Sequence, residues 1–158
     1  MPEKLNAEQC AELDITFPCN RMDNGEYRFR VMKGGNHGYG YILTMMPKDQ
    51  PGEWQNSHHH EKAMETYIVQ EGWIASARLL PDGFADIEVY RTGESFMTKP
   101  GEAHNVYMPS GAVIHTIKHG QLTGQKDWFA SPELDELTKG LNEIQIWDRA
   151  DKSMQASA

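Results

Sequence analysis

The sequence contains few cysteines and no long apolar segment, and both deficits limit the environments in which the chain works. Cys10 and Cys19 are its two cysteines, and no Cys-x-x-Cys pair is present. Two unpaired thiols in a reducing cytoplasm are the simpler interpretation, and a disulfide or redox pair is the alternative. No apolar run approaches the roughly 18 residues that cross a bilayer, and residues 1–20 show no signal-peptide pattern. We therefore expect a soluble cytoplasmic protein without a membrane partner.

Positive charge is also scarce in this chain. Its 158 residues include 15 Lys and Arg against 23 Asp and Glu, which is a formal net charge of −8. A phosphate backbone is bound by a basic surface, so nucleic acid is not an expected partner. The length suits one domain. The composition is 39% apolar, with four Trp, six Tyr and five Phe, which is enough to form a core and excludes global disorder.

Short β-prone runs separated by Gly, Pro, Asn and Asp fill residues 26–120. In the first run, 26–33, apolar residues alternate with Arg28 and Arg30, which is the pattern of a half-buried strand. Further strands are predicted at residues 39–46, 64–69, 73–80, 84–90, 95–98, 104–108 and 113–119. The turn residues between positions 64 and 90 predict consecutive hairpins. Regularly spaced short strands indicate an all-β antiparallel sandwich or barrel.

The segments outside the strands differ in composition. Residues 1–24 have too little apolar periodicity to fold alone, so we expect an N-terminal arm on a barrel of residues 25–120. Within residues 121–147, a Ser-Pro pair begins a predicted short helix, 131–141, in which leucines recur at helical spacing. This closing segment is expected to pack on the barrel. Residues 148–158 lack apolar periodicity and are predicted to be a loose tail.

Three of the seven histidines are consecutive, at His58, His59 and His60. On an extended strand, the period of two places His58 and His60 on one face and His59 on the other. A tight turn after His60 would fold the next strand back, and that strand carries Glu65 near its start. His104 begins another strand after a Pro-Gly turn. Three imidazoles and one carboxylate are therefore expected near one another.

These residues resemble two motifs of the cupin family. The first motif, G-x5-H-x-H-x4-E-x6-G, is matched at every fixed position, by Gly52, His58, His60, Glu65 and Gly72. The second motif, G-x5-P-x-G-x2-H-x3-N, is matched by Gly93, Gly101 and His104. Lys99 stands where the family has proline, and Met108 where it has asparagine. The resemblance implies a single-domain cupin, with a double-stranded β-helix (jelly-roll barrel) followed here by a short C-terminal helix.

The cupin resemblance also implies one divalent metal ion inside the barrel, held by His58, His60, Glu65 and His104. Three neutral imidazoles and a carboxylate suit Fe, Mn, Ni, Zn or Cu. Four such ligands leave two positions on an octahedral ion for water or substrate. Unrelated surface histidines are the alternative, but the matched spacing argues against it. His59 is expected to face outward.

Further residues are candidates for roles beside the metal. His115 lies on the more apolar face of its strand, so we expect it to point into the barrel and to bind substrate or transfer a proton. Tyr67 shares a strand face with Glu65 and could donate a hydrogen bond to a bound oxygen atom. For both candidate catalytic residues, a purely structural role is the alternative. Asp127 and Trp128 are expected to anchor one end of the barrel.

Three functions fit this sequence. The first is a metal-dependent sugar isomerase or epimerase acting on a small polar molecule, in which a metal bound to adjacent oxygen atoms acidifies the carbon between them. The second is a mononuclear non-haem metal dioxygenase of the cupin type, because several of these enzymes have three His and one Glu as ligands. The third is a non-catalytic, small-molecule-binding cupin. The family also commonly pairs through an N-terminal strand or a sheet face, so a homodimer is expected.

Overall fold

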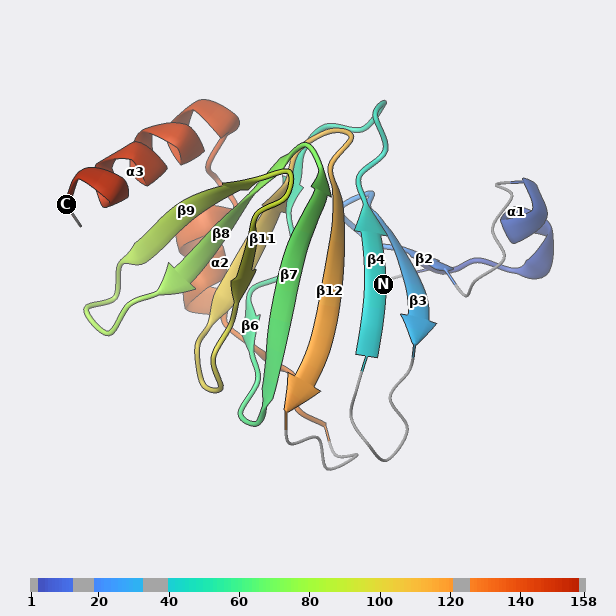
Figure 1. The fold of residues 1–158 in the computed structure, drawn as a ribbon, viewed down its shortest axis with the longest axis horizontal. Coiled ribbons are helices and arrows are strands. Elements are labelled where there is room, and N and C mark those ends of the chain that lie inside the picture. The colour runs from blue at the N-terminus through green and yellow to red at the C-terminus, as the bar shows by residue number, and fades with distance from the viewer. Residues whose placement is uncertain (1–2, 13–18, 33–39, 121–125, 157–158) are drawn as a thin grey trace.

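Two antiparallel β-sheets form the centre of the computed structural model, which describes residues 3–12, 19–32, 40–120 and 126–156 (Figure 1). Within these residues the larger sheet has the order β1 (Glu3–Lys4), β2 (Cys19–Arg21), β3 (Tyr27–Met32), β4 (Gly40–Met45), β12 (Val113–Gly120), β7 (Ala63–Glu71) and β10 (Ser95–Met97). The smaller sheet has the order β13 (Phe129–Ala130), β6 (His58–His59), β11 (His104–Met108), β8 (Trp73–Leu79) and β9 (Ala85–Arg91), and β5 (Glu53–Trp54) pairs with β11. The helices are α1 (Ala7–Glu12), α2 (Pro132–Thr138) and α3 (Glu143–Ala156). The all-β prediction with a short C-terminal helix is confirmed.

The core lies between the two sheets, because strand geometry turns every second side chain inward. Tyr67 of β7 and Ile114 of β12 pack there with Val106 of β11 in one buried cluster. All five residues of β11 are buried, because α2 covers the face of this strand that points away from the barrel. The amide of Asn105 in β11 donates a hydrogen bond to Thr138 Oγ1 of α2 at 3.1 Å. The strand that carries His104 is therefore held from both sides.

The predicted series of consecutive hairpins is only partly correct. β8 and β9 pair with each other through a continuous register from Trp73–Arg91 to Leu79–Ala85, as expected. β7 and β8 do not form a hairpin, because β7 pairs with β10 and β12 in the other sheet. The chain changes sheets at Gly72, whose φ of 79° lies in the left-handed region that glycine adopts without strain. This crossing closes one corner of the barrel.

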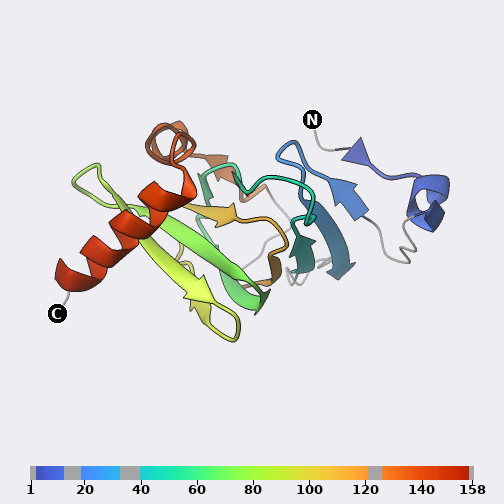
Figure 2. The ribbon, with the colours of Figure 1, turned by 90° about the horizontal axis from the view of Figure 1, so that it is seen from above.

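The C-terminal segment forms two helices outside the smaller sheet, and α3 crosses over β9 (Figure 2). The prediction of a loose tail at residues 148–158 is wrong for 148–156, which continue α3. The helix presents Ile146, Trp147 and Ala150 to the sheet, and the ring centroids of Trp147 and Trp73 are 5.0 Å apart. Most of this apolar face precedes residue 148, so the tail alone carries no periodic signal. No helix in the described residues is long and apolar enough to cross a membrane.

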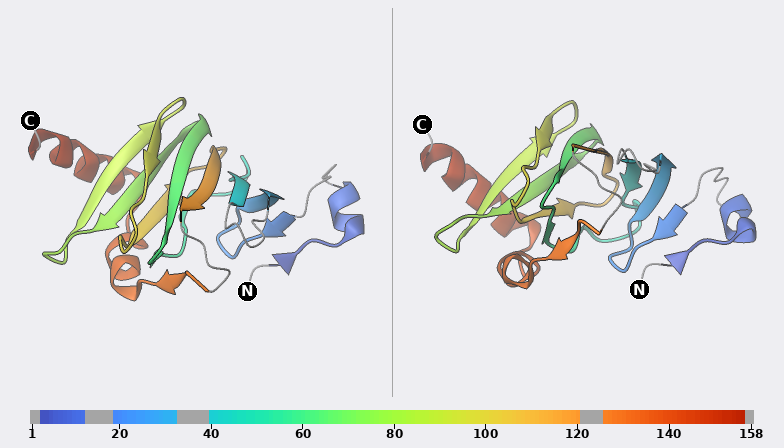
Figure 3. Two further views of the ribbon diagram at one scale, coloured as in Figure 1. Left: turned by 60° about the horizontal axis from the view of Figure 1, so that its bottom comes forward. Right: turned by 90° about the horizontal axis from the view of Figure 1, so that it is seen from below.

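The N-terminal arm extends the larger sheet rather than covering the barrel. β1 pairs with β2, and β2 pairs with β3, so this arm adds strands at the sheet edge. Figure 3 shows β1 and α1 projecting away from the two packed sheets, on the side opposite to α3. Cys19 of β2 is buried, whereas the side chain of Cys10 lies outside the described residues.

Helix α3 offers a matched pair of substitutions that tests its packing. Ile146 is fully buried, whereas Ile144, two residues earlier in the same helix, is 75% exposed. Ile146→Ala is expected to lower the free energy of unfolding by about 2–5 kcal/mol, and Ile144→Ala by no more than about 0.5 kcal/mol. Urea unfolding followed by circular dichroism measures both. Equal and negligible effects would show that α3 is not packed on the sheet.

Candidate metal centre

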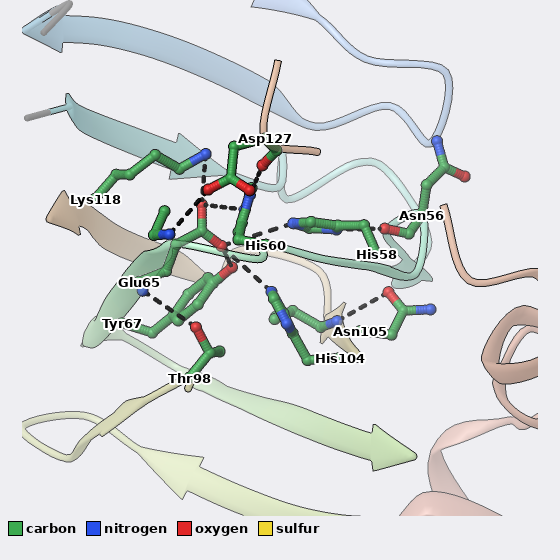
Figure 4. A network of polar contacts seen from close by, with 12 residues as sticks. Asn56, His58, His60, Glu65, Tyr67, Thr98, His104, Asn105, Lys118 and Asp127 are labelled. Atoms are coloured by element: carbon green, nitrogen blue, oxygen red, sulfur yellow. Dashed lines mark hydrogen bonds and ion pairs between the residues drawn. The ribbon is translucent and has the colours of Figure 1, made fainter. Parts of the chain in front are cut away.

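Three histidines and Glu65 converge between the two sheets (Figure 4). His58 lies in β6, His60 follows that strand, Glu65 lies in β7 and His104 begins β11 opposite His58. The Nε2 atoms of His58, His60 and His104 lie 3.6, 3.4 and 3.3 Å from the Glu65 carboxylate oxygens. The structure thus brings all four predicted ligands together. One donor atom from each of His58, His60 and Glu65 lies within 4.8 Å of the others, a spacing that could hold a metal ion.

The far side of each imidazole ring is held by a backbone carbonyl. Nδ1 of His58 donates to the oxygen of Asn56 at 2.9 Å, and Nδ1 of His104 donates to the oxygen of Glu102 at 3.0 Å. Nδ1 of His60 hydrogen-bonds the carbonyl of residue 127. An imidazole that donates through Nδ1 has its free lone pair on Nε2 when it is neutral. Metal-binding histidines are oriented in this way, so the three rings are set to donate electron pairs toward Glu65.

His60 provides a direct test of whether the cluster fits a cation. Its ring is 1% exposed, and its Nε2 is buried without a hydrogen-bond partner in the described structure. Leaving such an atom unsatisfied costs about 1–3 kcal/mol. A divalent ion bound to this nitrogen would remove that penalty, so the donor set and the orphaned atom both fit a metal. The ion itself stays a prediction.

The ionisation states of the cluster also suit a metal. Burial alone would raise the pKa of Glu65, but the neighbouring imidazoles of His104, His58 and His60 and the charge of Lys118 hold this pKa well below 4.5. Burial lowers the pKa of His58 below 6.5, against the opposing effect of Glu65. Glu65 is therefore ionised and His58 neutral at pH 7. These are the protonation states in which both side chains bind metals.

Asp127 and Trp128 fix the segment that carries the histidines, as expected for an anchor. The Asp127 carboxylate accepts hydrogen bonds from the backbone N–H groups of residues 61, 62 and 63 at 2.7, 3.2 and 2.9 Å. It therefore closes the predicted tight turn between His60 and β7. The Trp128 ring stacks on His58, with centroids 5.3 Å apart and an interplanar angle of 23°. Residues just after β12 in the chain thereby orient two of the candidate ligands.

Tyr67 is placed as predicted, on the same face as Glu65, and is 3% exposed. Its hydroxyl donates to Glu65 Oε2 at 2.7 Å. Burial raises the pKa of Tyr67 well above 10, and the charge of Glu65 adds to this effect, so the hydroxyl keeps its proton. The backbone N–H of Glu65 donates to Thr98 Oγ1 at 3.1 Å. Tyr67 thus orients the carboxylate and Thr98 fixes the backbone of Glu65, and a catalytic role for Tyr67 stays a prediction.

His115 does not point into the barrel, so that expectation is wrong. In β12 the buried residues are Ile114 and Thr116, and His115 lies on the opposite face, where its ring hydrogen-bonds Tyr41 and Gln70. Both faces of this strand contain apolar residues, so composition did not separate them. Lys118 lies on the inward face instead, and the sequence analysis did not identify it as a candidate site residue. His59 faces away from the cluster, as predicted, and stacks on the ring of residue 129.

A cavity of about 210 Å³ adjoins the cluster, with His58 and Glu65 in its wall. Arg28, Arg30 and Lys118 also line this cavity, and the Lys118 Nζ atom lies 3.3 Å from Glu65 Oε1. A larger and more open hollow of about 720 Å³ lies between residues 51–54 and 139–144, and none of the four clustered residues lines it. The smaller cavity is therefore the candidate ligand site.

Comparisons with known proteins agree with this architecture. No family model and no curated protein matches the chain. A conserved protein with a double-stranded β-helix domain from Klebsiella pneumoniae has a TM-score of 0.54 and 19% identity, over 70% of this chain and 89% of that one. KdgF from Halomonas sp. has a TM-score of 0.54 and 11% identity, over 67% and 88%. An oxalate decarboxylase–formate complex from Lactobacillus farciminis has a TM-score of 0.54 and 16% identity, over 72% and 34%.

These similarities show the fold, and they confirm the expectation drawn from the two sequence motifs: the chain has the double-stranded β-helix, or cupin, fold. The chain spans about a third of the length of the oxalate decarboxylase. Within this fold, the convergence of three imidazoles and one carboxylate defines a candidate mononuclear metal centre.

Substitution of the candidate ligands tests this centre. Loss of a group that only hydrogen-bonds a metal ligand lowers metal affinity by roughly 10- to 100-fold. His58→Ala and His104→Ala each remove a candidate ligand itself, so we expect a larger loss of affinity. His59→Ala is the matched control, because this neighbouring ring faces away from the cluster. Elemental analysis of the three purified variants measures the bound metal. Full metal content in His58→Ala and His104→Ala would refute the ligand assignment.

Proposed function

We propose that the chain is a metal-dependent enzyme that acts on a small polar, carbohydrate-like molecule by isomerase or epimerase chemistry. One observation carries the proposal: His58 and Glu65 belong both to the candidate metal cluster and to the wall of the 210 Å³ cavity. A molecule in this cavity would lie directly against the cluster. Four protein ligands also leave open positions on an ion that prefers six.

The residues of the cluster would have separate roles in this reaction. His58, His60, His104 and Glu65 would hold the ion, and Tyr67 keeps the carboxylate oriented through its hydrogen bond to Oε2. A bound divalent ion polarises the oxygen atoms that reach it and so raises the acidity of the adjacent C–H. The Trp128 ring stacks on His58 at the cavity wall and would cover that side of a bound molecule.

Lys118 takes the proton-transfer role that the sequence analysis assigned to His115. Its Nζ lines the cavity and lies 3.3 Å from Glu65 Oε1, so it carries exchangeable protons beside the candidate metal site. Among the described residues that line the cavity, Glu65 is the only carboxylate and it belongs to the ligand set. Lys118 is therefore the side chain best placed to move a proton to or from a bound molecule.

A solvent-exchange experiment tests the proposed reaction. Protein loaded separately with Mn, Fe, Ni, Zn and Cu is incubated in deuterated water with a panel of aldoses, ketoses and sugar acids. We expect at least one metal form to catalyse incorporation of deuterium into a substrate, at a carbon beside a carbonyl, which mass spectrometry detects. This exchange should occur without oxygen uptake. Oxygen consumption that depends on substrate and iron would contradict the proposal and favour a dioxygenase. Binding without any conversion would favour a non-catalytic small-molecule-binding cupin.

A lysine pair separates the role of Lys118 from a general effect of charge. Lys118→Met is expected to slow deuterium incorporation by roughly 10²- to 10⁴-fold, because a positioned acid–base group contributes that much. Lys48→Met is the control, since Lys48 pairs with Glu71 at 3.6 Å and its side chain is 84% exposed. Both variants should retain their metal. An unchanged rate in Lys118→Met would remove this residue from the mechanism.

A further inference from the structure

Strand β3 presents arginines, rather than its apolar residues, to the interior of the barrel. Arg28 pairs with Thr44 of β4 and Arg30 pairs with Ile42, and all four residues line the 210 Å³ cavity. In a half-buried strand the apolar residues usually form the buried face, so this orientation is the reverse of the usual pattern. Enclosing a guanidinium is costly unless a partner compensates the charge. The ion-pair partners of each arginine therefore indicate the charge of the ligand that the cavity binds.

Arg28 has its compensation within the protein. Its guanidinium lies 2.5 Å from Glu26 Oε1, and Glu26 is fully buried. The same carboxylate accepts hydrogen bonds from Gln55 Nε2 at 2.9 Å and Asn24 Nδ2 at 3.2 Å. Arg28 is consequently fixed in place, and it contributes a compensated charge to the cavity wall.

Arg30 has no such compensation. Its Nε donates to Asn20 Oδ1 at 3.0 Å, and its guanidinium forms no ion pair with a carboxylate among the described residues. Burial lowers its pKa, and the charge of Arg28 lowers it further. The terminal nitrogens of Arg30 therefore supply donors that the described protein leaves unused. A planar guanidinium matches a carboxylate through two parallel hydrogen bonds.

The cavity as a whole carries excess positive charge. Lys118 is the third cation of the wall, and its partner Glu65 is also a candidate metal ligand. Among the described residues, Arg28 pairs with Glu26 and Lys118 with Glu65, whereas Arg30 pairs with no carboxylate, and a divalent ion would add further positive charge. The chain has a net charge of −8, so this local excess does not follow from its composition. An anionic ligand would balance it.

We infer that the molecule bound in this cavity carries a carboxylate, which Arg30 binds while Arg28 and Lys118 supply supporting charge. The inference rests on the proposed function in taking the cavity as the substrate site, and it narrows the substrate to a small acid such as a hydroxy acid or sugar acid. The volume of about 210 Å³ lies below the roughly 300–1,000 Å³ of sites for drug-sized ligands, which limits the acid to a few carbons. Its hydroxyl or carbonyl end would face His58 and Glu65.

A calorimetric titration with three probes tests this inference on metal-loaded protein. The probes are glycolate, its neutral analogue glycolamide, and inorganic phosphate. We expect glycolate to bind at least about 10-fold more tightly than glycolamide, and more tightly than phosphate. Tighter binding of phosphate would assign the cationic wall to a phosphate group instead. Equal binding of glycolate and glycolamide, or no binding of any probe, would overturn the inference.

Variants of Arg30 separate its contribution from direct binding to the metal. Arg30→Met is expected to weaken glycolate binding by about 10- to 100-fold, with unchanged metal content and unchanged glycolamide binding. Arg30→Lys keeps the positive charge but not the planar guanidinium, so its affinity for glycolate should lie between those of Arg30→Met and the parent protein. Arg21→Met is the matched control, because Arg21 lies on the neighbouring strand β2 and its exposed side chain pairs with Glu3. Parent-like glycolate binding in Arg30→Met would overturn the inference.

Failure of this inference is distinguishable from failure of the proposed function. Carboxylate binding that depends on Arg30, without conversion of any sugar or sugar acid, would support the inference and contradict the enzyme. Conversion of a neutral sugar at the same rate in Arg30→Met would support the enzyme and contradict the inference.

Discussion

Burial of the Glu65 carboxylate among three imidazoles is the constraint on which the rest of the site depends. The residue is 5% exposed, and an uncompensated buried carboxylate would cost several kcal/mol. Its partners come from both layers of the fold: Tyr67 and Lys118 lie in the larger sheet, and His58 and His104 lie in the smaller one. The carboxylate is therefore stabilised only when the two sheets pack against each other. Closure of the barrel and assembly of the candidate metal centre are one structural event.

The orientation of the imidazoles depends on backbone close to His58 and His104 and, for His60, on a segment that is distant in the sequence. Backbone carbonyls hold the outer nitrogen of each ring, and those carbonyls belong to residues 56, 102 and 127. Asp127 also closes the turn after His60, so the chain that follows β12 returns to support the first histidine motif. Helix α2 adds a further support, because its contact with Asn105 fixes the strand that begins with His104. The donors are thus held rigidly before any ion binds.

Sequence patterns were sufficient to predict the fold class and the four clustered residues. The period of two along a strand selects His58 and His60 over His59, and the fixed spacings place Glu65 and His104 at the starts of other strands. The orientations of β3 and β12 were not predictable in the same way. Apolar residues occupy both faces of β12, and its register shifts near Val113. The inward position of Lys118 could therefore not be predicted from the sequence pattern. The rule that apolar residues face inward fails for β3, because the cavity there is lined by arginines.

The central claim is that the convergent nitrogens and the carboxylate hold a single metal ion. Anomalous X-ray diffraction from a crystal of the metal-loaded protein, recorded at the absorption edge of the bound metal, tests it most directly. We expect one anomalous peak at roughly 2.0–2.2 Å from Nε2 of His58, His60 and His104 and from the Glu65 carboxylate. The absence of a peak at this position, or a peak bound to other residues, would contradict the account.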